Sequence, residues 1–455
     1  MNEPLSTRPT LSERIAAYVH GADLKTIEPL AVQRAKEVIL YNVALALQCR
    51  RDEHPLGVQA VSIARDLSLQ GGPATLIGYR ERAMPLDAAF ANCSQMRAYT
   101  LDDVIFPAGI HSGLMAIPGA LALAEERGRS GRDVVVAVIV AYEVMGKLGT
   151  FAWDTQTPRR PTMAYGTFGA TIAAGRVLGL TREQFRHAIG YAAHSAQGVA
   201  EAGDLPGPPE HYYSLLTRAG MTGALVAEAG GRASSTALEG RFGFFDTFVG
   251  PQPVDADKLI ASLGHDYQIV DWVEKRYPGT GLNVVGVELL REIVTSQKLR
   301  SDDVREVRFI IPQERRNFEA GHATGPFTSA EEAKGNAVCH MAMLLVDGKL
   351  DFRRYEQFDA PEMRAAIAKI KPVLVPGKSN IRWTRIEVDV KDGRTIAREG
   401  ETHSFPPISA HERLADAAEG LLSPAKIERA VELFMKLEEQ PSIAPLMACL
   451  VPDAA

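Results

Sequence analysis

The chain has 455 residues, of which 46% are hydrophobic and 23% are charged. This composition is typical of a globular protein, and the length is sufficient for two or three core-forming units. The formal net charge of −6 excludes the strongly basic balance that nucleic-acid-binding proteins usually carry. We therefore expect the chain to bind a small molecule or a second copy of itself, and we expect no nucleic-acid partner.

Cysteine usage and hydrophobicity indicate a cytoplasmic protein. The four cysteines are widely spaced and form no CxxC pair, which is typical of reduced thiols in the cytosol. The N-terminal segment has acidic residues early and lacks the apolar core of a secretory signal. The longest apolar run, Val134 to Tyr142, is about half of the ~20 residues that a membrane span requires. We expect this run to lie in a buried helix, and we expect no membrane partner.

Apolar residues recur at helical spacing through roughly the first 250 residues. Capping boxes at Thr10–Glu13 and Thr181–Gln184 predict two helix starts. Small residues between Gly166 and Gly175 indicate a helix that packs closely against its neighbours. After the helix that begins at the first capping box, the helices predicted in this part of the chain span residues 27–47, 86–98, 112–127, 132–150, 167–178 and 182–197.

The pattern changes near residue 270. Alternation and then a β-branched run at 304–311 predict a strand. The stretches 385–390 and 394–397 predict a hairpin, because an Asp-Gly turn separates them. Helical patterns lie before and between these strands, at residues 282–296, 329–346 and 361–369.

Beyond residue 408 the chain becomes helical again, with Ser423 in an N-cap pattern before a proline. The chain is therefore predicted to form a helical domain, then an inserted α+β segment, and then further helices. We predict a mainly α fold with a large all-α helical domain from both chain ends, plus a smaller α+β domain. The predicted boundaries give residues 1–268 and 405–455 to the first domain and residues 269–404 to the second.

Motifs for several enzyme classes are missing from the sequence. The eleven histidines include no HExxH and no HxH, so we expect no metal site. Gly279-Thr-Gly281 lacks the third glycine of a dinucleotide-binding loop, and neither GxxxxGK[ST] nor GxSxG occurs. We therefore expect no cofactor, which leaves acid/base chemistry by side chains.

Proton transfer next to a carboxylate requires a base of near-neutral pKa, a general acid, and cations that hold the carboxylate. His111 stands at the mouth of the predicted helix 112–127, a few residues after Asp102 and Asp103. An imidazole suits proton transfer near neutral pH. Arginine suits bidentate binding of carboxylates.

The run from Asn92 to Asp103, followed by His111-Ser-Gly, resembles the MmgE/PrpD family. That family includes 2-methylcitrate dehydratases, cis-aconitate decarboxylases and iminodisuccinate epimerases, and its motif here reads NGxxxHxxDxDD followed by HPxG or HPSG. Asn92, the acidic pair and His111 match the motif. Arg97 stands where the family has a histidine, and Thr100 stands where it has the first aspartate.

Further blocks extend the resemblance along the chain. Arg160, before the GTFGA stretch, occupies the position of the family's second catalytic histidine. Lys275 matches the lysine of a KxYP motif. Arg316 stands where some decarboxylase members have a tyrosine, with Arg315 as the alternative for that position. The lysine of the family's TKPLHxG stretch falls on Leu215.

The resemblance implies a smaller α+β lid on the helical body, a homodimer, and a cofactor-independent, dehydratase-like lyase. The implied substrate is a small di- or tricarboxylate, and decarboxylation or epimerisation of a similar acid is the alternative reaction. His111 would move a proton α to a carboxylate. The implied catalytic residues are His111, Lys275 and Asp102, and the implied substrate-binding residues are Arg97, Thr100, Asp103, Arg160 and Arg316.

A second functional class remains open, because several family positions are changed. A non-catalytic paralogue that binds small anions would keep the fold and a basic cleft without turnover. The candidate residues also have structural interpretations. Asp102 and Asp103 fit a helix cap or a turn, Arg160 fits a solvated basic pair, and Lys275 fits a surface lysine.

Overall fold

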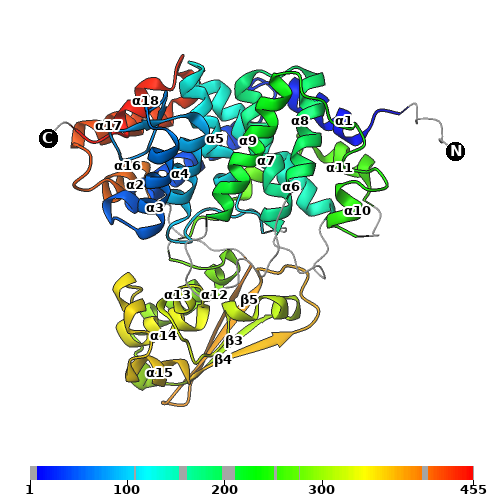
Figure 1. The fold of residues 1–455 in the computed structure, drawn as a ribbon. Helices are drawn as coiled ribbons and strands as arrows, with labels where there is room; N and C mark the ends of the chain where they lie inside the picture. Colours follow the sequence, from blue (N-terminus) through cyan, green and yellow to red (C-terminus); the bar gives the residue numbers. More distant parts are fainter. Residues whose placement is uncertain are drawn as a thin grey trace. The chain divides into compact units, whose positions relative to one another are not determined.

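Helices account for 60% of the chain and strands for only 9%, which confirms the predicted mainly α fold class. The computed structural model describes residues 8–106, 109–152, 161–196, 211–250, 254–275, 277–401 and 408–453 (Figure 1). These residues form two units. The helical unit contains those up to Glu274 and those from Ile408 onward, and the sheet unit runs from Lys275 to residue 401. The boundaries predicted from sequence were 268/269 and 404/405.

Both predicted capping boxes are present. Helix α1 (Leu11–Gly21) begins where the Glu13 backbone N–H donates to Thr10 Oγ1 at 3.3 Å. The Glu13 side chain in turn accepts from the Thr10 backbone N–H at 2.8 Å. Helix α8 (Arg182–Ser195) begins with the same reciprocal arrangement at Thr181 and Gln184. These local hydrogen bonds satisfy backbone groups that a helix start leaves open, which is why the sequence alone locates them.

Both the N-terminal and the C-terminal parts of the chain contribute helices to the helical unit. The C-terminal helices α16 (Ala410–Ala417) and α17 (Pro424–Met435) pack against α2 (Pro29–Arg51), as Figure 1 shows. Ser423 occupies the N-cap position of α17, although its side chain makes no cap hydrogen bond. The remaining helices of this unit are α3 (Pro55–Leu67), α4 (Pro85–Arg97), α5 (Ser112–Glu126), α6 (Gly131–Ala152), α7 (Pro161–Leu178), α9 (Tyr212–Glu228), α10 (Phe244–Phe248), α11 (Ala256–Ser262) and α18 (Ala444–Cys449).

Short elements complete the helical unit. A two-residue antiparallel pair, β1 (Ala74–Thr75) with β2 (Arg82–Ala83), interrupts the all-α character that the sequence predicts for this unit. Two 3-10 helices, η2 (Gln268–Asp271) and η7 (Leu437–Glu439), pack against α6. Strands of two residues carry too little alternation to be recognised in a sequence.

Helix α6 forms part of the core of the helical unit. Residues 131–151 are long and apolar enough for a membrane span, but 89% of the most apolar window is buried inside the protein. The predicted buried helix at 134–142 is therefore confirmed. Close packing through small residues of α7 is confirmed too, because a Cβ at Gly166 or Gly169 would clash with Met115 or Met145.

The sheet unit is built on four strands in the order β4-β3-β5-β6. Strand β3 (Val304–Pro312) confirms the predicted strand and runs antiparallel to β5 (Thr384–Val390). β5 and β6 (Thr395–Gly400) form the predicted hairpin, in which Gly393 takes a φ of +96° that favours glycine. The helices of this unit are α12 (Val284–Gln297), α13 (Ala330–Lys334), α14 (Ala337–Asp347) and α15 (Pro361–Ile367), with 3-10 helices η3 (Gly281–Asn283), η4 (Ser301–Asp303), η5 (Gln313–Gly321) and η6 (Phe352–Gln357).

Two features of the sheet unit differ from the sequence prediction. Strand β4 (Ile370–Val375) was not predicted; it is a half-exposed edge strand that contains Pro372, a residue that weakens any strand pattern. The single helix predicted at 329–346 is divided into α13 and α14. Asn336 separates them, because its side chain accepts from the Val338 and Cys339 backbone N–H groups and caps α14.

His340 of α14 is buried in the core of the sheet unit. Its ring lies 5.0 Å from the ring of Tyr277 and 5.6 Å from that of Tyr355, measured between centroids. Neither ring nitrogen has a hydrogen-bond partner among the described residues. Burial lowers the pKa of His340 from its ordinary value of 6.5 to about 3. The folded sheet unit therefore holds this imidazole in its neutral form.

We predict that His340 makes the sheet unit sensitive to acid. Between pH 6.5 and 3 the unfolded chain binds a proton at this residue and the folded chain does not. Stability should fall as the pH decreases through this window, by at most about 1.4 kcal/mol per pH unit from this residue. Urea unfolding followed between pH 7 and 4.5 should show a shallower pH dependence for His340→Phe, and an unchanged one for His411→Gln at the exposed His411. An unchanged slope in His340→Phe would contradict the prediction.

Candidate active site

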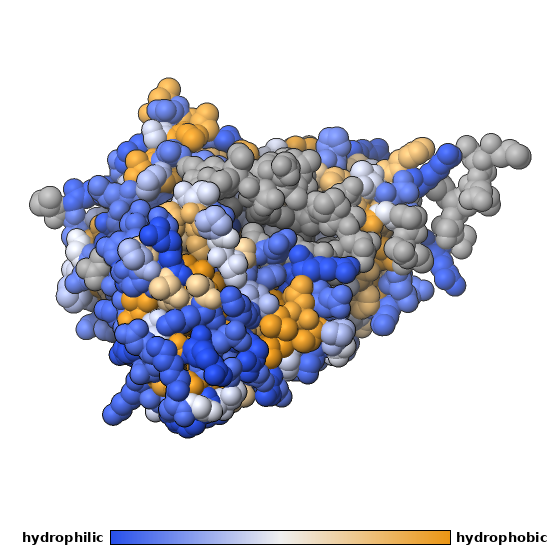
Figure 2. Space-filling view, turned by 90° about the horizontal axis from the view of Figure 1, so that it is seen from below, coloured by the Kyte–Doolittle hydropathy of each residue, from blue (hydrophilic) through white to orange (hydrophobic). Residues whose placement is uncertain are grey.

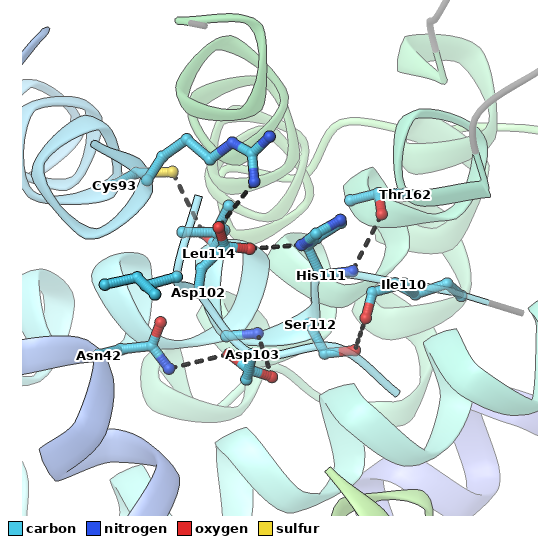
Figure 3. Close-up of polar contacts among 12 residues, drawn as sticks. Asn42, Cys93, Asp102, Asp103, Ile110, His111, Ser112, Leu114 and Thr162 are labelled. Carbon is cyan, nitrogen blue, oxygen red and sulfur yellow. Dashed lines mark hydrogen bonds and ion pairs between the residues drawn. The ribbon is translucent and has the colours of Figure 1, made fainter. Parts of the chain in front are cut away.

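His111 is the N-cap residue of α5, and its side chain makes no cap hydrogen bond. Its backbone N–H donates to Thr162 Oγ1 of α7 at 2.9 Å, as Figure 3 shows. The imidazole is therefore not used to cap the helix but is held at the start of it. The ring keeps 19% of its side-chain surface exposed, so it is reachable from outside the core.

A buried carboxylate holds the His111 ring. Asp102 is completely buried, and its Oδ2 forms a short contact with Nδ1 of His111 (Figure 3). A carboxylate at Nδ1 favours the tautomer with the proton on that nitrogen. Nε2, on the opposite edge of the ring, is then the atom that can accept a proton in a reaction.

Arg97 holds the other oxygen of the same carboxylate. Its Nη1 donates to Asp102 Oδ1 at 2.7 Å, and both side chains are buried. One carboxylate therefore lies between a guanidinium and an imidazole. The arginine that replaces the family histidine is thus part of a buried ion pair with the carboxylate that orients His111.

Asp103, although adjacent in sequence, serves a different purpose. Its carboxylate accepts from Asn42 Nδ2 at 2.9 Å, from the Tyr142 hydroxyl at 2.7 Å and from the Gly113 backbone N–H at 3.4 Å. Burial, with the Asp103 charge adding to it, raises the pKa of the Tyr142 hydroxyl well above its ordinary range. These bonds fasten the first turn of α5 to α2 and α6. The structural interpretation of Asp103 therefore has direct support, and its substrate-binding role stays a prediction.

The loop that carries the two aspartates is fixed along its length. Thr100 has a φ of +56°, an uncommon conformation for a β-branched residue, and its N–H donates to the Arg97 carbonyl at 2.9 Å. Val104 pairs with Val273, whose N–H donates to its carbonyl at 2.9 Å. The Tyr41 hydroxyl donates to the Leu101 carbonyl. Asp102 and Asp103 are therefore presented by a braced loop.

Tyr213 of α9 is a site residue that the sequence analysis did not identify. The Arg97 guanidinium carbon lies 4.8 Å from the centroid of its ring, and the His111 ring lies 5.6 Å from it. The available signal was weak: two tyrosines follow a proline-rich loop, and no family motif marks them. Only packing brings α9 next to the start of α5.

The remaining predicted site residues belong to the sheet unit or lie outside the described residues. Arg160 lies outside the described residues. Lys275 is buried and Arg316 is exposed, and both belong to the sheet unit. Arg315 is buried instead, donates to the Ile381 carbonyl at 2.8 Å, and has a pKa that burial lowers to about 9.

Other polar positions near α9 make contacts of their own. Leu215, where the family has its lysine, is exposed on α9. His211 Nδ1 lies 3.1 Å from Ser94 Oγ, and its Nε2 lies 3.2 Å from Gln59 Oε1. Burial lowers the pKa of His211. This histidine is therefore neutral at physiological pH and joins α9 to α3 and α4.

The described residues contain no group of three or more histidine, cysteine, aspartate or glutamate side chains arranged to hold a metal ion. What they do contain is an imidazole with one edge on a buried carboxylate and the opposite edge away from it. This arrangement can take a proton from a neighbouring molecule and return it.

The MmgE/PrpD N-terminal domain matches residues 13–257, more than half of the chain. The chain belongs to the MmgE/PrpD family. It is 25% identical to a cis-aconitate decarboxylase of Homo sapiens, with 94% of this chain and 92% of the relative aligned. It is 23% identical to a cis-aconitate decarboxylase of Aspergillus terreus, with 92% and 91% aligned. The resemblance inferred from the motifs around His111 is thereby confirmed.

We predict that Gly113 is required for the packing of the aspartate loop on α5. A Cβ at this position would lie 2.1 Å from Asp103 Oδ1 and 2.5 Å from Asn42 Nδ2. Gly113→Ala should therefore lower the free energy of unfolding by roughly 1–3 kcal/mol through overpacking. Thermal unfolding followed by circular dichroism measures the effect. Gly21→Ala is the control, since a Cβ there meets nothing within 4 Å among the described residues; equal melting temperatures for the two variants would contradict the prediction.

Proposed function

We propose that this protein is a cofactor-independent lyase that acts on a small di- or tricarboxylate, with His111 as the proton-transfer group. The observation that carries the proposal is the His111–Asp102 pair, which holds a partly exposed imidazole at the start of α5. Similarity to cis-aconitate decarboxylases over more than nine-tenths of the chain supports the class of substrate.

Two reactions of this class use the same group. In a dehydration, Nε2 of His111 takes the proton α to a carboxylate, the electron pair forms the double bond, and hydroxide leaves with a proton from an acid. In a decarboxylation, carbon dioxide leaves first, and protonated His111 gives its proton to the carbon that keeps the electron pair. Both steps require a group whose pKa is near the working pH. The names of the relatives support decarboxylation, and the acid/base pair supports either reaction.

Binding of a polycarboxylate requires cationic side chains. The Arg97 guanidinium is already engaged by Asp102, so we propose that it acts mainly on Asp102 and His111. Lys275 stays the predicted second catalytic group, and Arg160 and Arg316 stay predicted carboxylate ligands. A non-catalytic anion-binding role is the second candidate, because exposed Leu215 supplies no charge where the family has a lysine.

We predict that His111→Gln lowers kcat by roughly 10²–10⁴-fold with a small change in KM, because the variant loses the proton acceptor. Turnover of cis-aconitate, citrate and 2-methylcitrate should be measured by product analysis, which separates loss of water from loss of carbon dioxide. His194→Gln, at an exposed histidine of α8, is the matched control.

Near-wild-type turnover in His111→Gln would show that another group moves the proton. Thermal stabilisation of the wild-type protein by these acids without any turnover would support the anion-binding paralogue instead.

We also propose that the protein is a cytoplasmic homodimer. The described cysteines are free thiols, which suits a reducing compartment. Large apolar side chains reach the surface of the helical unit, such as Leu69 at 87% and Phe242 at 83% exposure. On the face shown in Figure 2, hydrophobic residues gather in separate patches among hydrophilic ones. Such patches favour self-association.

Light scattering at micromolar concentration should give twice the chain mass of 49.3 kDa. Dilution to nanomolar concentration, followed by mass photometry, tests how tightly the copies associate. A single-chain mass at micromolar concentration would disprove the dimer.

A further inference from the structure

Tyr213 lies against both side chains that contact Asp102. Its ring is buried, with the Arg97 guanidinium carbon 4.8 Å from its centroid and the His111 ring 5.6 Å away at an interplanar angle of 53°. Asp102 contacts the same two side chains through its two oxygens. Arg97 and His111 are therefore each held from two directions, by a carboxylate and by an aromatic ring.

The position of Tyr213 is itself fixed by neighbouring contacts of α9. Ser214 Oγ lies 2.6 Å from Ser94 Oγ of α4, and both serines are completely buried. One turn further along α9, Thr217 Oγ1 donates to the Leu114 carbonyl of α5 at 2.9 Å. These bonds set α9 in register with the helix that carries Arg97 and with the helix that follows His111. The Tyr213 ring therefore has a fixed position beside Arg97 and His111.

Arginine and an aromatic ring attract one another when the guanidinium lies over the ring, and the attraction grows when water is excluded. The Arg97 guanidinium donates to Asp102 through Nη1, and a ring packed against a guanidinium restricts the rotation of the arginine side chain further. A catalytic group displaced by about 1 Å can lose roughly 10²-fold in rate. A restrained Arg97 therefore helps to fix the position of Asp102, and through Asp102 that of the His111 imidazole.

We propose that the aromatic ring of Tyr213 is a positioning residue, which holds Arg97 and His111 on Asp102 for proton transfer. The inference rests on the proposed function of His111 and adds a residue to it. The ring is the part that acts, because both contacts are made by the ring.

The test compares side chains that keep or remove the ring. Tyr213→Phe should keep kcat within about 3-fold of wild type, and Tyr213→Leu should lower kcat roughly 10-fold or more with KM changed by less than about 3-fold. Phe242→Leu, which removes an exposed ring from the same unit, is the matched control and should leave kcat unchanged. Equal loss in the Phe and Leu variants would overturn the proposal, because the hydroxyl would then be the active part. Unchanged kcat in Tyr213→Leu would overturn it as well.

A shape-conserving series covers the case in which Tyr213→Leu fails to fold. Phenylalanine with an increasing number of ring fluorines at position 213 weakens the negative face of the ring while nearly preserving its size. A progressive fall of kcat along the series, at near-constant melting temperature, is the expected result. Equal kcat for phenylalanine and its most fluorinated form would overturn the proposed contact with Arg97.

A measurement without substrate separates this inference from the proposed function. Protein labelled with ¹³C in its histidine rings gives a signal for His111, assigned by its loss in His111→Gln. The signal should stay in place in Tyr213→Phe, and it should move or broaden in Tyr213→Leu as the ring loses its fixed orientation. An unchanged signal in Tyr213→Leu would overturn the positioning role. If the wild-type protein turned over none of the tested acids but the His111 signal changed in Tyr213→Leu as expected, the proposed function would be rejected. The role of Tyr213 in positioning His111 would be kept.

Discussion

The candidate site depends on two neighbouring carboxylates that are removed from water. Asp102 and Asp103 are adjacent in sequence, but their carboxylates have different partners. Asp102 orients His111 and pairs with Arg97, whereas Asp103 ties the first turn of α5 to Asn42 and Tyr142. A buried carboxylate is costly unless it is paired or hydrogen-bonded, so these partners are a condition of the fold. The His111 imidazole and the first turn of α5 are thus both held by one dipeptide.

The departures from the family pattern acquire a physical meaning from this arrangement. Arg97 replaces a histidine and cannot act as a base near neutral pH. Its buried ion pair with Asp102 and its place over the Tyr213 ring give it a structural task beside the imidazole. The change therefore replaces a titratable imidazole by a permanent positive charge on the carboxylate that contacts His111. Such a site fits acid/base chemistry on an anion with His111 as the single imidazole on Asp102.

Sequence-based prediction succeeded where local interactions determine structure. The capping boxes at Thr10 and Thr181 and the Asp392-Gly393 turn involve residues within four positions of one another. It failed where an element depends on distant partners. Strand β4 (Ile370–Val375) contains a proline and exists because β3 (Val304–Pro312) lies beside it. The motif indicated Asp102, Asp103 and His111 within one stretch of the chain, but Tyr213 is about 100 residues from that stretch and carries no motif.

By itself, the sequence determined the mainly α class, the family, and the stretch around His111 in which the candidate site lies. Those properties follow from hydrophobic periodicity, local capping and a contiguous motif, and each of these signals depends only on residues that are close together in sequence. Only the tertiary structure decided the division of labour between Asp102 and Asp103, the ion pair of Arg97 and the contacts of Tyr213. The reason is that helix packing brings α4, α5 and α9 together, and the resulting side-chain contacts join residues whose separation in sequence carries no periodic signal.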